Sequence, residues 1–141
     1  NTFADKHIDS YEKPKTKTIP VVGKVAAGTP ILAEENIEYY VLVDDRDSVD
    51  FALKVRGDSM INARIYDGDL IFVRKQPIVE NGEIAIVLVE DEATCKRFYQ
   101  YGKTVVLRPE NSNYKEMVYG KSDKARIEVL GKVIFLKSYL N

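Results

Sequence analysis

Residues 84–108 read IAIVLVEDEATCKRFYQYGKTVVLR. Runs of aliphatic, β-branched and aromatic side chains at 84–89, 94–101 and 104–108 are separated by acidic or glycine-containing turns, a pattern typical of consecutive short strands. The acidic residues at 90–92 predict a solvated loop between the first two runs. This stretch therefore predicts a β-sheet rather than a helical fold.

Three further runs extend the sheet on both sides of this stretch. Residues 49–56 (VDFALKVR) alternate between apolar and polar side chains, residues 70–73 are apolar after a turn at 67–69, and residues 127–140 form a long terminal run. The prolines lie at the edges of runs or in connections, where strands tolerate them. We expect a compact, mostly β domain with a partly closed antiparallel or mixed sheet.

Local signals add one hairpin and one short helix to this expectation. Asn81-Gly82 is a strong two-residue hairpin signal immediately before the run at 84–89. The helical candidate is short and covers residues 59–65, so helices should contribute little to the fold.

Composition limits the class of protein. The chain has 141 residues, about one domain, and its 45% hydrophobic and 30% charged residues suit a globular core. Lysine plus arginine number 21 and aspartate plus glutamate 22, a net charge of -1 that argues against strong nucleic-acid binding by this chain alone. No apolar run approaches the roughly 18 residues of a membrane span. We expect a cytoplasmic protein with no membrane contact.

The chain is expected to divide near Ile19. Residues 1–18 are polar, with interspersed charges and few aliphatic side chains, which predicts a flexible linker or tether. The composition changes at Ile19, and residues 19–141 should form the folded domain.

Cysteine and histidine each occur once, which excludes several kinds of site. Cys95 cannot form an internal disulfide or a multi-cysteine metal site, and we interpret it as a small, half-buried apolar residue. With His7 alone, a histidine-based triad or a histidine-rich zinc site is nearly excluded. We expect no metal and no cofactor, and a catalytic base would have to be another residue type.

The segment RGDSM at residues 56–60 follows a predicted strand. Gly57 permits a sharp turn, which would place the Ser59 hydroxyl group beyond the strand end. Backbone N–H groups at such a turn can form an oxyanion hole. The simpler interpretation is an ordinary turn in which Ser59 or Asp58 caps a short helix.

Lys96 lies in the run at 94–101, where alternation places it on one face with Thr94 and Phe98. If that face points inward, desolvation lowers the pKa of the Lys96 amine. A neutral lysine can act as a general base and would replace the missing histidine. The alternative is an edge-strand lysine in solvent.

A third feature is the connection VAAGTP at residues 25–30, which by itself predicts only an exposed loop. Together, the three features resemble the C-terminal self-cleavage domain of LexA-like and phage-type repressors, which are serine-lysine peptidases. The resemblance covers about residues 19–141. It rests on IPVVGKVAAG at 19–28, GDSM at 57–60, DGD at 67–69, TCKR at 94–97, RPEN at 108–111 and GKVI at 131–134.

This resemblance implies that the chain cleaves its own peptide bond between Ala27 and Gly28. Ser59 would be the nucleophile and Lys96 the general base, while Val25 would anchor the cleavage loop in an apolar pocket. The backbone N–H groups of Ser59 and of Asp58, which precedes it, would form the oxyanion hole.

The resemblance also implies partners. The apolar side chains at 133–136 and 139–140 suggest a terminal strand edge through which a two-fold homodimer forms, although the run could instead be central core. A RecA filament would activate cleavage after DNA damage, in the SOS response. DNA would be bound only through an N-terminal domain, of which residues 1–18 show no motif.

Two other functions stay open from the sequence. An accessory subunit of a translesion polymerase shares the serine-lysine core of this family, although residues 26–38 are more similar to repressors. A non-catalytic β interaction module would share the fold alone.

Overall fold

The computed structural model describes residues 15–25 and 28–140. The strands are β1 (Thr16–Val22), β2 (Ile37–Asp44), β3 (Phe51–Lys54), β4 (Leu70–Lys75), β5 (Ile84–Val89), β6 (Glu92–Tyr101), β7 (Thr104–Arg108), β8 (Met117–Tyr119) and β9 (Ile127–Lys137). Two 3-10 helices, η1 (Glu34–Asn36) and η2 (Ile61–Ala63), interrupt the connections. The described residues contain no α-helix, and none of their helices has the length and apolar character needed to cross a membrane.

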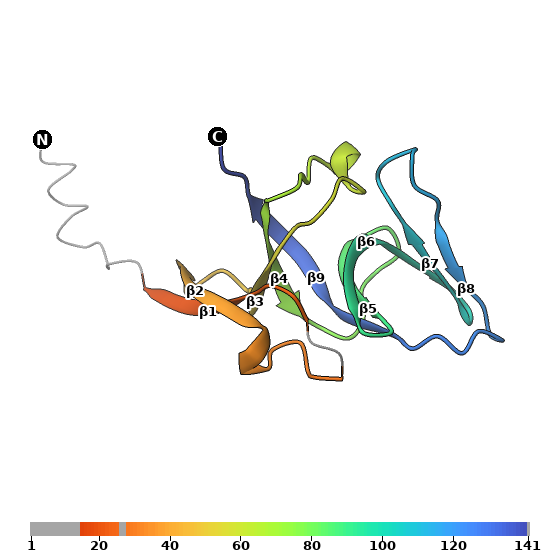
Figure 1. Cartoon of the computed structure of the whole chain (residues 1–141), viewed down its shortest axis with the longest axis horizontal. Helices are drawn as coiled ribbons and strands as arrows, with labels where there is room; N and C mark the ends of the chain where they lie inside the picture. Colours follow the sequence, from red (N-terminus) through yellow and green to blue (C-terminus); the bar gives the residue numbers. More distant parts are fainter. Residues whose placement is uncertain (1–14, 26–27, 141) are drawn as a thin grey trace, which may run out of the picture.

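All these strands belong to one mixed sheet in the order β2-β1-β3-β4-β9-β5-β6-β7-β8. β1 and β3 pair in parallel through Val21 and Val22, whereas the other neighbouring strands are antiparallel. β9 occupies the centre, with β3 and β4 on one side of it and β5 to β8 on the other, as Figure 1 shows. The expectation of a mostly β domain with a mixed sheet is confirmed.

Strand bounds follow the short apolar runs closely where turn or charged residues bound them. β5 and β7 occupy residues 84–89 and 104–108 as expected, and the short helix expected within 59–65 is the single 3-10 turn η2. The acidic loop is reduced to a tight turn, because β6 begins at Glu92 and Glu90 takes a left-handed φ of 54°.

The hairpin expected at Asn81-Gly82 is wrong as a link between neighbouring strands. These residues do form a turn before β5, but β9 lies between β4 and β5 in the sheet. The turn instead lies beside β6: the Gly82 N–H donates to the Phe98 carbonyl oxygen at 2.8 Å, and the Asn81 side chain bonds the backbone of Gln100. Asn81-Gly82 thus sets the local turn, whereas the order of the strands depends on β9, which comes from the end of the chain.

The first strand begins before the composition changes. β1 starts at Thr16, so residues 16–18 of the expected linker belong to a strand, and residues 1–14 lie outside the described part of the chain. Its buried residues are Ile19, Val21 and Val22. β1 pairs along its whole length with β2, a strand that the sequence pattern did not indicate.

The terminal strand joins the two halves of the sheet. β5 pairs with residues 127–132 of β9, and β4 pairs with its residues 131–137. Within the described strands, only Gly131 and Lys132 pair with both neighbours. Among the described strands, β4 alone pairs with residues 133–137, so this segment keeps one open edge.

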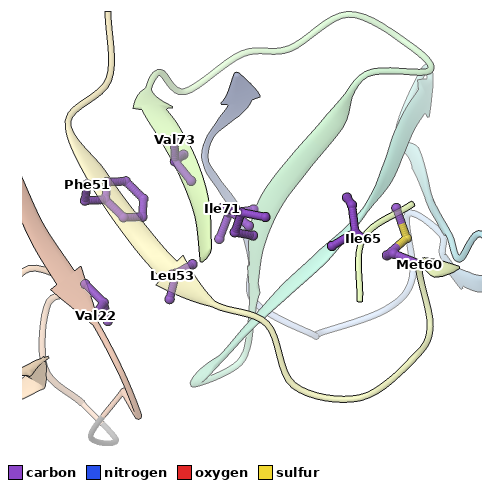
Figure 2. Packing of buried hydrophobic residues seen from close by; sticks show 8 residues of the cluster. Val22, Phe51, Leu53, Met60, Ile65, Ile71 and Val73 are labelled. Atoms are coloured by element: carbon purple, nitrogen blue, oxygen red, sulfur yellow. The ribbon is translucent and has the colours of Figure 1, made fainter. Parts of the chain in front are cut away.

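A buried cluster supports the region around Ser59. It contains Val22, Phe51, Leu53, Met60, Ile65, Ile71, Val73 and Ile86, drawn as sticks in Figure 2. Met60 directly follows Ser59 and is only 2% exposed. Burial of a methionine side chain contributes about 1.5–3 kcal/mol, so the loop that carries Ser59 is anchored in the core by the next residue.

Candidate active site

The loop after β3 turns sharply at Gly57, which takes a left-handed φ of 85° that suits glycine. The Gly57 N–H donates to Asp67 Oδ1 at 2.7 Å, and Val55 forms backbone hydrogen bonds with the DGD turn at 67–69. The DGD turn therefore holds the strand end beyond which Ser59 lies.

The loop between β7 and β8 holds the same turn from a second direction. The Glu110 N–H donates to the Ser59 carbonyl oxygen at 2.8 Å, and the side-chain amide of Asn111 donates to the Asp58 carbonyl oxygen at 2.8 Å. Tyr114 donates its hydroxyl group to the Asp58 carboxylate. The sequence singled out RPEN as a similarity without a role, and the structure shows that this segment braces the Ser59 turn.

Lys96 extends from β6 to the Ser59 hydroxyl group. Its Nζ lies 3.1 Å from Ser59 Oγ and donates to Thr94 Oγ1 at 2.8 Å. The alternative of a lysine in solvent is wrong, because Lys96 is half-buried and its amine contacts the side chains of Ser59 and Thr94. Burial lowers the pKa of the Lys96 amine, since desolvation disfavours its charged form. Within the described residues, no carboxylate forms a salt bridge with Lys96 to oppose this effect.

Ser59 and Lys96 line a cleft of about 780 Å³. Val25, the expected loop anchor, lines the same cleft and packs against the buried cluster beneath it. Ala27, on one side of the expected cleavage position, lies outside the described residues, and Gly28 on the other side takes a φ of 77°. The structure therefore brings the anchor, the hydroxyl group and the amine to one cleft.

A second, smaller cavity also reaches Ser59 and Lys96. It has a volume of about 270 Å³, and Tyr114 and Met117 also line it. The hydroxyl group and the amine thus lie where two cavities meet.

Comparison with known proteins places this geometry in a family. A profile of the family described as Peptidase S24-like matches residues 20–134. The chain belongs to the peptidase S24-like family. The resemblance found in the sequence is confirmed.

Several similar proteins are named LexA repressor. The chain is 48% identical over 134 residues to the LexA repressor of Desulfitobacterium hafniense, covering 92% of this chain and 62% of that protein. It is 46% identical over 123 residues to the LexA repressor of Magnetococcus marinus (86% and 52%) and 41% identical over 122 residues to that of Myxococcus xanthus (82% and 55%). The chain thus spans between 52% and 62% of the length of these relatives.

Cys95, beside the lysine of this peptidase S24-like domain, behaves as an apolar residue. It is half-buried and packs against the cluster beneath the cleft. Desolvation raises the pKa of its thiol to about 12, so the thiol stays protonated at neutral pH and is a poor nucleophile. Among the described residues, no group of three or more His, Cys, Asp or Glu side chains could hold a metal ion.

The sequence did not indicate the role of a buried asparagine near the expected cleavage position. Asn36 is 2% exposed, and its side-chain amide donates to Thr29 Oγ1 at 3.1 Å and to the carbonyl oxygens of Pro30 at 2.9 Å and Ile31 at 3.3 Å. It therefore holds the segment that follows Gly28. An asparagine in the polar stretch AEEN carries no local signal for this role, because its burial arises only from the fold.

Proposed function

We propose that this chain is the self-cleaving serine-lysine peptidase domain of a LexA-like transcriptional repressor. The observation that carries the proposal is the 3.1 Å separation of Ser59 Oγ and Lys96 Nζ in a cleft that Val25 also lines. Membership of the peptidase S24-like family and similarity to LexA repressors support it. In a non-catalytic module, a desolvated lysine beside a serine would only lower stability.

The proposed reaction passes through an acyl-enzyme. Neutral Lys96 accepts the hydroxyl proton of Ser59 while Oγ attacks the carbonyl carbon of Ala27. The oxyanion that forms accepts hydrogen bonds from the N–H groups of Asp58 and Ser59. Lys96 then gives the proton to the amine of Gly28 as the peptide bond breaks, and water hydrolyses the ester to restore Ser59.

Protonation of Lys96 controls the rate of this reaction. A lysine with the ordinary pKa of about 10.4 is only about 0.04% neutral at pH 7. Burial lowers the pKa of Lys96, and docking of the cleavage segment over the amine would desolvate it further. Loop docking and base activation then form one coupled equilibrium, which keeps the chain intact until docking is favoured.

The wider role in the proposal follows from the LexA relatives. Cleavage between Ala27 and Gly28 inactivates the repressor in response to DNA damage, in the cytoplasm. A RecA filament is the proposed co-activator, and it acts by favouring the docked loop. DNA is bound by an N-terminal domain outside residues 1–141.

The second half of β9 supplies the proposed homodimer contact. Residues 133–137 pair with β4 on one side only, and Tyr139 and Leu140 beyond them are 66% and 100% exposed. In a two-fold dimer the open edges of two copies can pair antiparallel, which gives each exposed backbone group a partner.

Incubation at about pH 10 tests the proposed cleavage directly. The expected result is a C-terminal product that begins at Gly28, found by intact-mass spectrometry and formed faster as the pH rises, because more Lys96 is neutral. Ser59→Ala and Lys96→Ala should each abolish the product. Ser112→Ala, which removes an exposed hydroxyl group, should cleave like the unmodified chain. Cleavage at another bond, or undiminished cleavage by Ser59→Ala, would contradict the proposal.

A further inference from the structure

In the turn that carries Ser59, the backbone carbonyl groups of Asp58 and Ser59 have hydrogen-bond partners, whereas their N–H groups have none among the described residues. The carbonyl oxygen of Asp58 accepts from Asn111 Nδ2 at 2.8 Å and, at the longer distance of 3.4 Å, from the Ile61 N–H. The carbonyl oxygen of Ser59 accepts from the Glu110 N–H at 2.8 Å. The N–H groups of Asp58 and Ser59, by contrast, have no acceptor within the described part of the chain. The carbonyl groups are therefore fixed while the two proposed oxyanion donors stay available.

The fixed Asp58 carbonyl group and the available Ser59 N–H are parts of one peptide group. The Asp58 carbonyl and the Ser59 N–H belong to the same trans peptide, in which C=O and N–H point in opposite directions. Asn111 is 6% exposed, so its bond draws the Asp58 oxygen into the protein. The Ser59 N–H must then point away from the loop between β7 and β8. Ser59 lines both cavities, where a substrate carbonyl group would lie.

The Asn111 amide is itself fixed in orientation. Its Oδ1 accepts from the Asn113 N–H at 2.9 Å, which leaves Nδ2 as the group that faces Asp58. The loop is also tied to the strand of the proposed base: Arg97 pairs with the Glu110 carboxylate and donates to the Gly82 carbonyl oxygen at 2.7 Å. These contacts of Arg97 hold the loop that carries Asn111 Nδ2 in place relative to β6.

We propose that Asn111 is a positioning residue that orients the Ser59 N–H as an oxyanion donor. This inference rests on the proposed self-cleavage. Without the Asn111 donor, the Asp58 carbonyl oxygen keeps only the longer bond from the Ile61 N–H at 3.4 Å among the described residues. The peptide between Asp58 and Ser59 is then held less firmly, and the direction of the Ser59 N–H is less fixed. The Ser59 hydroxyl group and Lys96 keep their own contact, so the proton transfer is not affected directly.

Asn111→Leu tests this role, because leucine has a similar size but no donor and no charge. Self-cleavage is followed by intact mass from about pH 7 to 11, at temperatures well below the melting transition of each variant. The expected result is a rate plateau about 100-fold lower, the effect of losing one oxyanion donor. The pH midpoint should not move, because it reports Lys96.

Glu116→Ala is the matched control. It removes another polar contact of the same loop, the ion pair between Glu116 and Arg108, which does not reach the Ser59 turn. Its plateau should stay within about threefold of the unmodified chain. If Asn111→Leu shows no cooperative melting transition, Asn111→Ala removes the same donor and is judged by the same criteria.

The outcomes separate this inference from the function on which it rests. An unchanged plateau in the Asn111 variants, a midpoint moved to higher pH, or an equal loss in Glu116→Ala would each overturn the positioning role. Ser59→Ala decides the other question in the same assay. If that variant cleaves normally the proposed function fails, whereas an inactive Ser59→Ala beside a fully active Asn111→Leu overturns the inference alone.

Discussion

Replacing Lys96 with methionine should change how stability depends on pH. The Lys96 amine is half-buried and contacts the side-chain oxygens of Ser59 and Thr94. We would make the substitution in a Ser59→Ala background, because self-cleavage at alkaline pH would otherwise consume the protein. In that background, methionine removes a desolvated amine together with its hydrogen bond to Thr94.

The sign of the effect follows from the two pKa values of Lys96. Burial lowers its pKa in the folded state, while the unfolded chain keeps the ordinary value of about 10.4. Between these values the unfolded state binds more protons, so stability of the lysine protein rises with pH across this window. The charge penalty is present in full below the folded pKa and absent above about pH 10.4.

The magnitude follows from the same linkage. Each unit of lowering corresponds to about 1.4 kcal/mol, reduced here because water still reaches a half-buried amine. Loss of the hydrogen bond to Thr94 costs about 1 kcal/mol at every pH. Methionine therefore gains relative stability at neutral pH and loses that gain as the pH rises above the folded pKa of Lys96.

Thermal unfolding followed by circular dichroism from about pH 7 to 11 measures this difference. A change of 1 kcal/mol corresponds to about 4 °C in Tm for a domain of this size. The Tm of Ser59→Ala/Lys96→Met minus that of Ser59→Ala should fall as the pH rises. Lys103→Met in the same background removes an exposed lysine between β6 and β7 and should show no such trend.

Two results would refute this reasoning. A Tm difference that is independent of pH would show that the Lys96 amine is not desolvated. A loss of about 3–5 kcal/mol at pH 7 would show that Lys96 instead neutralises a buried carboxylate, which methionine leaves unpaired. Either result would remove the physical basis for Lys96 as the general base.

Two further predictions concern packing and assembly. A Cβ atom at Gly131 would lie 2.3 Å from the Arg74 carbonyl oxygen and 2.6 Å from Val73 Cγ1. Gly131→Ala should therefore lower the free energy of unfolding, measured in urea, by about 1–3 kcal/mol. Unchanged stability would mean that β4 and β9 separate easily. Sedimentation equilibrium at micromolar concentration should give twice the 16.0 kDa chain mass, and a monomer at all concentrations would contradict pairing through residues 133–137.

The strands were predictable where a short apolar run is bounded by turn or charged residues. β5 and β7 have the expected bounds because each is such a run, and β5 carries three consecutive buried residues, as in a strand covered on both faces. β1 was not assigned from the sequence, and Pro20, expected at the edge of a run, lies inside this strand although it has no N–H to donate to a ladder. The sheet accommodates this proline because β3 pairs with β1 only at Val21 and Val22, which leaves the preceding part of β1 with an open edge.

Strand order was not predictable from local signals. Asn81-Gly82 correctly indicates a turn, yet the two strands that flank it are not neighbours, because β9 inserts between them. That insertion depends on the close approach of Gly131 to the backbone of Arg74, a contact across more than fifty residues. The same insertion places the apolar terminal run inside the sheet: residues 127–130 pair with β5 alone, Gly131 and Lys132 pair with both neighbours, and residues 133–137 pair with β4 alone.

In the candidate site, too, some residues could be predicted from the sequence and others only from the fold. Ser59 and Lys96 could be proposed from the sequence because their motifs together resemble those of the serine-lysine peptidases, whereas each residue alone also fits an ordinary turn or an exposed strand. Asn36 and Asn111 could not, since asparagine is common in exposed turns and only the fold buries these two side chains. Yet their amides fix the segment after Gly28 and the peptide before Ser59. The sequence therefore identifies the groups that would react. The fold then buries two asparagine side chains, and their amides hold the backbone around these groups in place.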